Sequence, residues 1–365
     1  MIRVGIDATP LLGTRTGIGA AVAGILEALP GHPRLDVIGY GLTATGWRLL
    51  PALLPAGVRS ARRRPLPAAA LLRAWARFDH PRLESATGPI EVAHGTNFVV
   101  PPTRRAARLV SVWDLTAWRY PELCTPTSRL YPALIERAVG TGAMVHTASQ
   151  YVADEVASDL GVPAERVRMV SPGITAPSGT RMAAAGGAPY VLALGTVEPR
   201  KDLPRLVAAF DQIAARHHDL ELRIVGPPGW GEEDLAEAVE AAHHRARIRR
   251  TGWVDDIGEV LQGAAVFAYP SLYEGFGFPP LEAMARGVPV VATSAGSLPE
   301  VLGDGACLVP VRDADALAEA LDQVLTDQDR RSALVRAGHR QVARYSWAAA
   351  GEELSALYEE LASHN

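Results

Sequence analysis

The chain has few cysteines, no excess of one charge sign and no long apolar run. Cys124 and Cys307 are the only cysteines among 365 residues, and they have neither metal-site spacing nor a disulfide framework, which indicates a reducing cytoplasm. The formal net charge is -4, which argues against a general nucleic-acid-binding surface. No apolar run reaches membrane-spanning length and no signal segment precedes the first strand pattern, so we expect a soluble protein.

Short apolar segments alternate with helical segments along most of the chain. Strand patterns occupy 2–6, 36–40, 90–94, 107–112, 143–147, 167–170, 190–195, 220–226, 248–252, 266–269 and 288–292. This alternation is typical of βα units wound into parallel sheets that helices cover on both faces. We therefore predict an α/β protein with two doubly wound, Rossmann-like domains that face a central cleft.

Length and composition predict where the two domains divide. At 365 residues the chain suits two cores of ordinary size. Residues 172–189 are rich in Gly, Ala, Pro and Ser without periodicity, so we predict an interdomain linker there. The N-terminal domain would cover 1–171, the C-terminal domain 190–345, and a final helical segment 346–365.

Two carboxylates in the second half mark a candidate ligand site. Glu274 follows the buried strand pattern 266–269, and Glu282 lies in a helix that begins near Pro279 and Pro280. The glycines between them, Gly275 and Gly277, leave room for a ligand beside the backbone. The alternative is an ordinary turn glutamate followed by a solvated helix glutamate.

Two cations form the second half of the candidate site. Arg200 and Lys201 lie between the strand at 190–195 and an amphipathic helix that starts at 203. A guanidinium fork and a mobile ammonium suit a diphosphate whose charge grows as it leaves. The alternative is a solvated pair beside Asp202. The turn at Thr16, Gly17 and Gly19 is a weaker signal, because it lacks the full spacing of a dinucleotide fingerprint.

The order of these segments resembles the family-four retaining glycosyltransferases, which have the GT-B fold. The resemblance rests on GTVEPRKD at 195–202, RIVG at 223–226, TGWV at 251–254, PSLYEGFGFPPLE at 270–282 and GVPVV at 287–291. It extends more loosely to the first half through TGIG at 16–19, HGTN at 94–97, SVWDL at 111–115 and TAS at 147–149. YSW at 345–347 also fits the family, whose last helix crosses back onto the first domain.

The resemblance implies a role for each matching residue. Glu274 would hold hydroxyls of the donor sugar, Glu282 the ribose of its nucleotide, and Arg200 and Lys201 the diphosphate. The other implied donor contacts are Gly275, Phe276, Gly277, Gly226, Trp253, Val254 and Thr196. No metal or other cofactor is implied, and Asp255-Asp256 lacks the Asp-x-Asp arrangement of metal-dependent sugar transferases, so we interpret these two residues as a helix cap.

Two positions depart from the family pattern. Thr196 stands where many relatives carry arginine. Trp113 precedes Asp114 where the family has a histidine close to the donor sugar, and indole has no basic nitrogen. His94 lies at a nearby strand end and is either a cleft residue, like Gly17 and Gly19 on the acceptor side, or a histidine with satisfied internal hydrogen bonds.

These features together predict a metal-independent, retaining transferase that moves a sugar from a nucleoside-diphosphate sugar to a sugar, lipid-linked or small-molecule acceptor. The resemblance favours GDP-mannose as donor, then a UDP-sugar. The alternatives are a nucleotide-sugar-binding protein with little turnover, which Trp113 suggests, and an epimerase on the same fold. The arginine-rich stretch from Arg59 to Arg82 is either a solvated segment or a peripheral contact with the inner face of a membrane.

Overall fold

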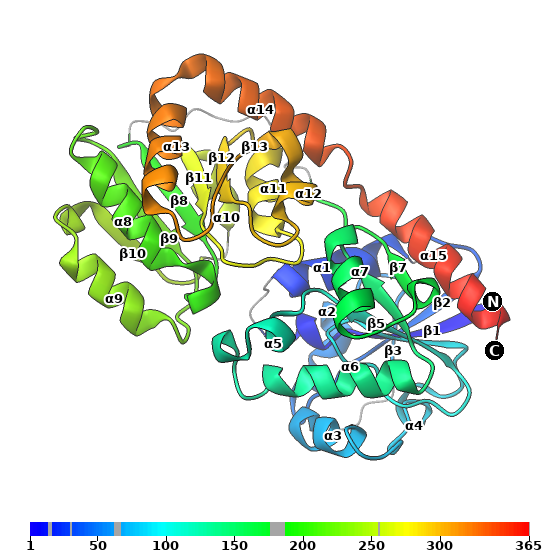
Figure 1. The fold of residues 1–365 in the computed structure, drawn as a ribbon. Coiled ribbons are helices and arrows are strands. Elements are labelled where there is room, and N and C mark those ends of the chain that lie inside the picture. The colour runs from blue at the N-terminus through cyan, green and yellow to red at the C-terminus, as the bar shows by residue number, and fades with distance from the viewer. Residues whose placement is uncertain (14–16, 30, 62–66, 176–186, 255, 365) are drawn as a thin grey trace. The chain divides into compact units, whose positions relative to one another are not determined.

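A computed structural model describes residues 1–13, 17–29, 31–61, 67–175, 187–254 and 256–364 (Figure 1). The chain divides into two compact units. Unit 1 contains residues 1–173 together with 345–365, and unit 2 contains residues 174–344. Most of the predicted linker, residues 176–186 of 172–189, lies outside the described residues.

Unit 1 is built on a parallel sheet with the strand order β3-β2-β1-β4-β5-β6-β7. β1 pairs with β2 on one side and with β4 on the other, so the winding of the sheet reverses between β1 and β4. Its strands are β1 (Ile2–Asp7), β2 (Leu35–Tyr40), β3 (Arg59–Ser60), β4 (Val92–Gly95), β5 (Ala107–Val112), β6 (Met144–Thr147) and β7 (Val167–Met169).

Eight α-helices of unit 1 are described. They are α1 (Gly17–Ala28), α2 (Leu50–Leu53), α3 (Ala68–Trp75), α4 (Glu84–Thr87), α5 (Thr116–Arg119), α6 (Tyr131–Gly140), α7 (Gln150–Asp159) and α15 (Trp347–Ser363). Ser149 caps α7 by accepting a hydrogen bond from the Val152 N–H at 3.3 Å, as serine commonly does at this position.

The last helix, α15, packs on the first. Gly24 faces the Trp347 ring so closely that a Cβ built on this glycine would lie 2.2 Å from the indole. Leu354, Leu357 and Tyr358 are buried on the same helix. The C-terminal segment therefore completes the core of unit 1.

Unit 2 has a parallel sheet with the order β10-β9-β8-β11-β12-β13, which is the doubly wound arrangement of Rossmann folds. The winding reverses between the paired strands β8 and β11. The strands are β8 (Tyr190–Leu194), β9 (Glu221–Val225), β10 (Ile248–Thr251), β11 (Val266–Tyr269), β12 (Val290–Thr293) and β13 (Ala306–Val309).

Helices cover both faces of this sheet, so its central strands β8, β11 and β12 are buried along their whole length. Alternate strand residues such as Val191 and Ala193 share one buried cluster with Phe210 and Leu321 of two helices. The helices are α8 (Leu203–Ala214), α9 (Glu232–Ala241), α10 (Ile257–Gln262), α11 (Phe278–Ala285), α12 (Leu298–Leu302), α13 (Ala314–Thr326) and α14 (Gln328–Val342).

Short 3₁₀ helices occupy several connections. They are η1 (Thr9–Leu11), η2 (Gly46–Arg48), η3 (Pro121–Leu123), η4 (Ser128–Leu130), η5 (Ala164–Arg166), η6 (Pro199–Lys201), η7 (Arg245–Arg247) and η8 (Gly303–Gly305). Among them, η6 carries both cations of the candidate site.

Candidate functional site

The candidate site lies where the winding of the unit 2 sheet reverses. The loop after β8 carries Arg200 and Lys201 on η6, and the loop after β11 carries Glu274. Because β8 and β11 are neighbours, both loops leave the same edge of the sheet side by side. Ligands of doubly wound sheets bind at this kind of position, beyond the carboxyl ends of the strands.

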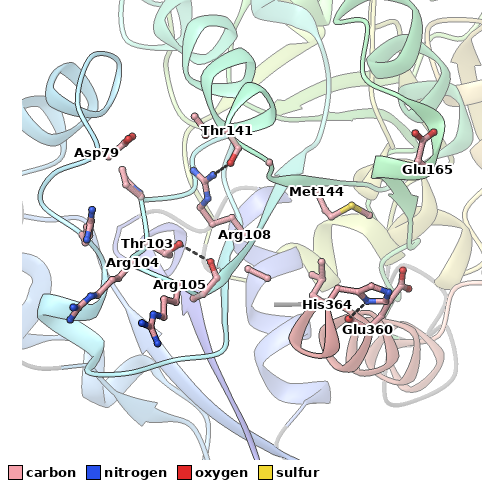
Figure 2. Close-up of a pocket in the computed structure, with 16 residues that line it drawn as sticks. Asp79, Thr103, Arg104, Arg105, Arg108, Thr141, Met144, Glu165, Glu360 and His364 are labelled. Atoms are coloured by element: carbon pink, nitrogen blue, oxygen red, sulfur yellow. Dashed lines mark hydrogen bonds between the residues drawn. The ribbon is translucent and has the colours of Figure 1, made fainter.

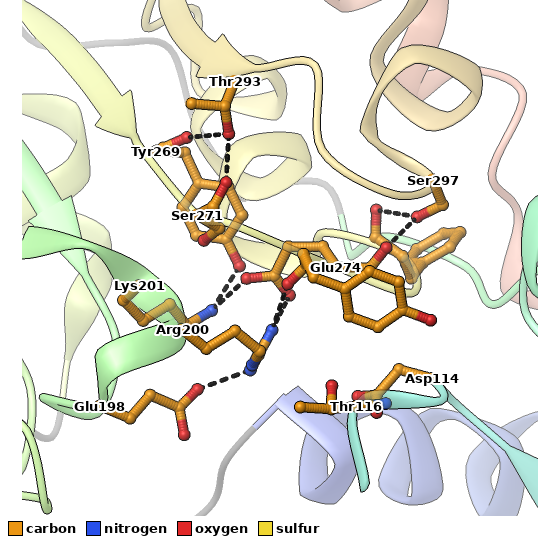
Figure 3. Close-up of polar contacts among 12 residues, drawn as sticks. Asp114, Thr116, Glu198, Arg200, Lys201, Tyr269, Ser271, Glu274, Thr293 and Ser297 are labelled. Atoms are coloured by element: carbon orange, nitrogen blue, oxygen red, sulfur yellow. Dashed lines mark hydrogen bonds and ion pairs between the residues drawn. The ribbon is translucent and has the colours of Figure 1, made fainter. Parts of the chain in front are cut away.

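Arg200 bridges two carboxylates (Figure 3). Its guanidinium lies 2.6 Å from Glu198 Oε1 and 2.6 Å from Glu274 Oε2. It also donates to the Tyr273 carbonyl at 2.9 Å. Only 15% of the side chain is exposed, so the alternative of a solvated arginine is wrong. The sequence did not identify Glu198 as a site residue, although its position two residues before Arg200 was visible.

Lys201 is held between two acceptors. Its Nζ donates to Glu274 Oε1 at 2.6 Å and to the Tyr269 hydroxyl at 2.7 Å. Lys201 is 9% exposed, so this cation is not solvated either. The Asp202 carboxylate pairs with Arg205 instead. Tyr269 was missed as a site residue, because a tyrosine that ends a buried strand pattern gives no separate signal.

Glu274 joins both cations. Burial alone would raise the pKa of its carboxyl, but the charges of Arg200 and Lys201 outweigh this effect and lower the pKa to about 2. Burial lowers the pKa of the Lys201 ammonium, and Glu274 opposes that shift. Together with Glu198, the cluster contains two cations and two carboxylates.

The loop around Glu274 is fixed by hydrogen bonds to its backbone. The Ser297 N–H and hydroxyl both donate to the Glu274 carbonyl, at 2.9 and 3.1 Å. Gly277 has a φ of 109°, a left-handed conformation that favours glycine, and it precedes the first residue of α11. Gly275 and Phe276 are buried in the same turn.

The start of α11 offers fewer donors than an ordinary helix N-terminus. Phe278 is its first residue, so Pro279 and Pro280 take the next two positions, and proline has no N–H. Leu281 donates to the Gly277 carbonyl. The start of α11 is therefore a weak anion site by itself, which leaves Arg200 and Lys201 as the stronger candidates for contact with a phosphate.

Glu282 lies in α11, one turn beyond the prolines. Burial raises the pKa of its carboxyl to about 7, although the Arg286 charge acts in the opposite direction. The described contacts of Glu282 include no hydrogen bond to its carboxylate. Once ionised, this half-buried carboxylate is suited to accept hydrogen bonds from hydroxyl groups of a ligand.

The other residues expected to contact the donor lie in unit 2 loops. Thr196 is half-buried after β8, and Gly226 follows β9 and donates to the Thr251 carbonyl at 3.1 Å. Trp253 is 46% exposed and Val254 is half-buried in the loop after β10. All four follow the carboxyl ends of strands, but their contacts with a nucleotide stay predictions.

Asp256 caps a helix, as the sequence predicted. Its carboxylate accepts from the Gly258 N–H at 2.7 Å at the start of α10. Asp255 lies outside the described residues. In the described part of the chain, no group of three or more His, Cys, Asp and Glu side chains is arranged to hold a metal ion.

In unit 1, the predicted glycine-rich turn is partly helical. Gly17 is the first residue of α1 and Gly19 is buried within it, so both glycines belong to the helix that follows the turn. Thr16 lies outside the described residues. The roles of both glycines on the acceptor side stay predictions.

Trp113 is packed inside unit 1. It is 5% exposed, and its indole N–H donates to the Thr96 carbonyl at 2.7 Å. Its ring meets His146 edge-on, with centroids 5.9 Å apart. The neighbouring Asp114 accepts from the Thr116 N–H at 2.9 Å. The indole has only this one N–H donor, and the Thr96 carbonyl already accepts from it.

Of the two alternatives for His94, the structure supports the histidine whose hydrogen bonds are satisfied internally. It is fully buried, with Nδ1 2.7 Å from the Tyr358 hydroxyl and Nε2 2.8 Å from Ser111 Oγ. Ser111 Oγ is also 2.8 Å from His146 Nδ1, and His146 Nε2 is 3.0 Å from the Val170 carbonyl. His94 therefore offers neither ring nitrogen to a ligand.

Tyr358, His94, Ser111 and His146 form a series of hydrogen bonds that ends at the Val170 carbonyl. The direction of each bond follows from that end. A carbonyl only accepts, so the His146 proton is on Nε2 and its Nδ1 accepts from Ser111. Ser111 must then accept from His94 Nε2, and His94 Nδ1 accepts from the Tyr358 hydroxyl. Both rings are neutral in this arrangement, and burial correspondingly lowers the pKa of His94 and that of His146.

The arginine-rich stretch contributes to a polar pocket of unit 1 (Figure 2). The pocket holds about 600 Å³ and is lined by Arg82, Arg104, Arg105 and Arg108, among others. Its acidic residues include Asp79, which pairs with Arg137 at 2.7 Å, and Glu360, which pairs with Arg168 at 3.1 Å. The pocket opens near the amino ends of β5 and β6, the edge opposite to that of Trp113.

The apolar residues of the arginine-rich stretch from Arg59 to Arg82 mostly face the core. Leu71, Leu72 and Trp75 of α3 are buried, whereas Phe78 is 62% exposed. Arg62 to Arg64 lie outside the described residues. Among the helices that the structure describes, none combines the length and apolar character needed to cross a membrane. A membrane contact here would have little apolar surface.

Comparison with known proteins connects this chain to a family. Residues 181–341 match the family model described as Glycosyl transferases group 1. The O-antigen chain mannosyltransferase B of Escherichia coli is 31% identical over 273 residues, which cover 70% of this chain and 71% of that protein. A phosphatidyl-myo-inositol mannosyltransferase of Mycolicibacterium smegmatis is 34% identical over 218 residues, and the match spans 55% of either protein.

Solved structures share the fold across nearly the whole chain. Sucrose-phosphate synthase from Thermosynechococcus elongatus aligns with a TM-score of 0.77 and 20% identity, covering 100% of both chains. Anabaena HepE in complex with UDP-glucose aligns with a TM-score of 0.74 and 16% identity, covering 99% of this chain and 100% of that one. Both confirm the predicted GT-B class of fold. The family model and the Escherichia coli relative show that this chain belongs to the group 1 glycosyl transferases.

Proposed function

We propose that this glycosyltransferase moves mannose from a nucleoside-diphosphate sugar to an acceptor hydroxyl, with retention of configuration and without a metal ion. The observation that carries the proposal is the pairing of Arg200 and Lys201 with Glu274 beside β8 and β11. It places two buried cations and a carboxylate where a doubly wound sheet binds its ligand. The group 1 family relationship supports transfer chemistry.

In this proposal the cations stabilise the leaving group. The bond between the anomeric carbon and the phosphate oxygen breaks, and negative charge grows on the departing diphosphate. Arg200 and Lys201 are held in place by Glu198, Tyr269 and Glu274 before the ligand arrives, so little reorganisation is needed when that charge develops. Preorganised charges of this kind supply the largest part of many rate enhancements.

Glu274 and Glu282 orient the donor. Glu274 would accept hydrogen bonds from sugar hydroxyls while it stays paired with the cations, and Glu282 would accept them from the ribose. Retention requires that the acceptor attack from the face that the diphosphate leaves. The leaving phosphate oxygen would take the acceptor proton, so the step needs no side-chain base and no metal.

Mannose is proposed first because of the relatives, and GDP because the segment at 195–202 resembles mannosyltransferases. The similar proteins include an O-antigen chain mannosyltransferase and a phosphatidyl-myo-inositol mannosyltransferase. A UDP-sugar is the second proposal, because HepE has been solved with UDP-glucose. The acceptor would belong to a polysaccharide, a glycoconjugate or a glycosylated metabolite.

Purified protein tests the proposal directly. It would be incubated with GDP-mannose and with UDP-sugars, each with mannosides and lipid-linked sugars as acceptors, in buffer containing a chelator. Nucleoside diphosphate release measures turnover, and the anomeric coupling constant of the product reports retention. We expect turnover with GDP-mannose in the presence of the chelator. Product of inverted configuration, or activity that only a divalent ion restores, would contradict the mechanism.

Two alternatives predict other outcomes in the same experiment. A protein that only binds nucleotide sugars would bind nucleoside diphosphates tightly and release none from any donor. The burial of Trp113 and the use of its N–H by Thr96 keep this alternative open, because the residue offers no reactive group. An epimerase would isomerise the donor sugar without acceptor, which chromatography of the recovered donor detects.

We separately propose that the protein is cytoplasmic and that residues 59–82 contact the inner face of a membrane. Arg73, Arg77 and the exposed Phe78 support it, although the apolar face of α3 is buried. Sedimentation with vesicles of anionic and of neutral lipid tests it. Binding that requires anionic lipid and is lost in Phe78→Ser would support contact at this surface, and equal recovery with both lipids would exclude it.

A further inference from the structure

Tyr269 occupies an unusual place for a residue at the end of a buried strand. It closes β11 and is 2% exposed, yet its hydroxyl reaches the charged cluster and accepts from Lys201 Nζ at 2.7 Å. Its ring also lies against the same ammonium, with Nζ 4.6 Å from the ring centroid. The residue therefore contacts Lys201 through both its hydroxyl and its aromatic ring.

The ammonium needs such a partner because of where it lies. Burial disfavours its charged form, and Arg200 beside it adds a like charge. Glu274 compensates for part of this cost, but its carboxylate is shared with Arg200. The Tyr269 hydroxyl is a second acceptor, held in place by β11. It keeps the ammonium from pointing toward Glu274 alone.

The count of donors shows what remains for a ligand. An ammonium has three N–H donors. In the described contacts of Lys201, Glu274 and Tyr269 each take one of them. The third N–H can then point only within the narrow range that the first two contacts allow.

We propose that Tyr269 is a positioning residue for the transfer reaction, whose hydroxyl and ring hold the Lys201 ammonium charged and directed toward the leaving diphosphate. The inference rests on the proposed function, in which Lys201 binds that diphosphate. It adds a residue that acts through Lys201 and does not itself touch the substrate.

The charged groups that face Lys201 come from two loops. Glu198 and Arg200 lie on its own loop, and Glu274 and the Tyr269 hydroxyl lie at the end of β11 and in the loop after it. Removing the hydroxyl takes away one acceptor of the ammonium, together with the hydroxyl's own contact with Glu274, and leaves the three charged groups in place. The ammonium should then lose its proton at a lower pH.

The test uses Tyr269→Phe in the full-length protein, because phenylalanine keeps the ring and removes only the hydroxyl. Tyr190→Phe is the matched control. Tyr190 is a buried tyrosine of the same unit, and its hydroxyl donates to the Val260 carbonyl at 2.7 Å, away from Lys201. Both variants would be compared with the wild type in kcat and KM for GDP-mannose from pH 6 to 10, and in the calorimetric affinity for inorganic pyrophosphate.

We expect Tyr269→Phe to lower kcat by about 10- to 100-fold, the range for a misplaced catalytic group, with a smaller change in KM. The loss of activity and of pyrophosphate binding at high pH should both move to lower pH, whereas Tyr190→Phe should keep the wild-type profile. An unchanged kcat and pH profile in Tyr269→Phe would overturn the positioning role while the transferase function stands.

Two further outcomes are decisive. If Tyr269→Phe and Tyr190→Phe lose activity equally and neither shifts the pH profile, the effect is loss of packing and the inference is wrong. If the wild type neither turns over any donor nor binds pyrophosphate, the proposed function fails and the inference fails with it. Pyrophosphate binding whose alkaline loss moves in Tyr269→Phe would support the inference even in a protein without turnover.

Discussion

Glu274 balances two buried cations, and this determines what its loss should do at the scale of the residue. Its side chain is 8% exposed and contacts Arg200 and Lys201 at 2.6 Å each. Removing one partner of a buried ion pair leaves an uncompensated charge, which costs more than the pair contributed. The effect on folding should therefore be large even when the shape of the side chain is kept.

We predict that Glu274→Gln abolishes transfer and destabilises unit 2 by about 3 kcal/mol at pH 7. The folded-state pKa of about 2 lies below the usual 4.5, so the stabilisation is present above pH 4.5 and is lost as the pH falls toward 2. Urea unfolding at pH 7 and at pH 3 measures this difference. The deficit of the variant should shrink at pH 3.

Glu319→Gln, at an exposed position of α13, is the control for loss of a carboxylate and should unfold like the wild type. A deficit in Glu274→Gln that is the same at pH 7 and pH 3 would mean that the charge of Glu274 is not what stabilises the loop.

Glu282 should make donor binding depend on pH near neutrality. Its pKa of about 7 means that the free protein is half protonated there, and only the ionised form accepts from both ribose hydroxyls. We predict that affinity for a nucleoside-diphosphate sugar rises about tenfold from pH 6 to pH 8, by linkage to one proton. Calorimetry with the intact sugar nucleotide avoids the titration of a terminal phosphate.

Glu282→Gln is the comparison, because the amide does not titrate. Its affinity should be independent of pH over the same range. The same rise in the variant and in the wild type would assign the proton to another group.

At the scale of the element, the sequence predicted where most strands and helices lie. It did not predict which of them lie side by side. Predicted strand limits agree with β1, β2 and β5 to within one residue. β3 has only two residues, both exposed, and so has no apolar pattern, and β13 was missed because Ala306–Val309 is short and lies beside Gly303 and Gly305.

The candidate site shows the same limit. The sequence identified Arg200, Lys201 and Glu274 from their local loops, but not that they pair with one another. That contact joins residues 73 apart in the chain and depends on β8 and β11 being neighbours. The sequence also left open whether His94 was satisfied internally, because Tyr358, its partner, is 264 residues away.

Gly24 provides a prediction for the contact of α1 with α15. A Cβ there would overlap the Trp347 ring, so Gly24→Ala should destabilise unit 1 by about 1–3 kcal/mol, the usual cost of overpacking, although alanine favours helix. Gly140→Ala is the matched control, since a Cβ on this helical glycine meets no atom within 4 Å. Thermal unfolding of both variants measures the difference. Equal melting temperatures would show that α15 adjusts without cost.

At the scale of the whole molecule, unit 1 is assembled from both ends of the chain. α15 contributes Leu354, Leu357 and Tyr358 to its core, and Tyr358 supplies the proton that begins the His94 hydrogen-bond chain. Unit 2 contains residues 174–344 and has its own buried cluster. The two units should therefore respond differently to loss of the C-terminus.

We predict that a chain ending at Arg344 keeps a cooperative unfolding transition for unit 2 and loses the transition of unit 1. Without α15, the apolar surface of α1 is exposed and His94 lacks its donor. Scanning calorimetry and limited proteolysis distinguish the units. Tyr358→Phe, which keeps the helix but not the hydroxyl, should lower only the unit 1 transition. Two intact transitions in the shortened chain would contradict the role of α15.

The position of α15 also determines the order in which the protein matures during synthesis. All of unit 2 leaves the ribosome before the helix that completes unit 1. At about 5–20 residues per second, the N-terminal segment waits on the order of ten to thirty seconds with the face that α15 covers unprotected. Unit 1 therefore finishes folding only after α15 has been made, whereas unit 2 needs no segment beyond residue 344.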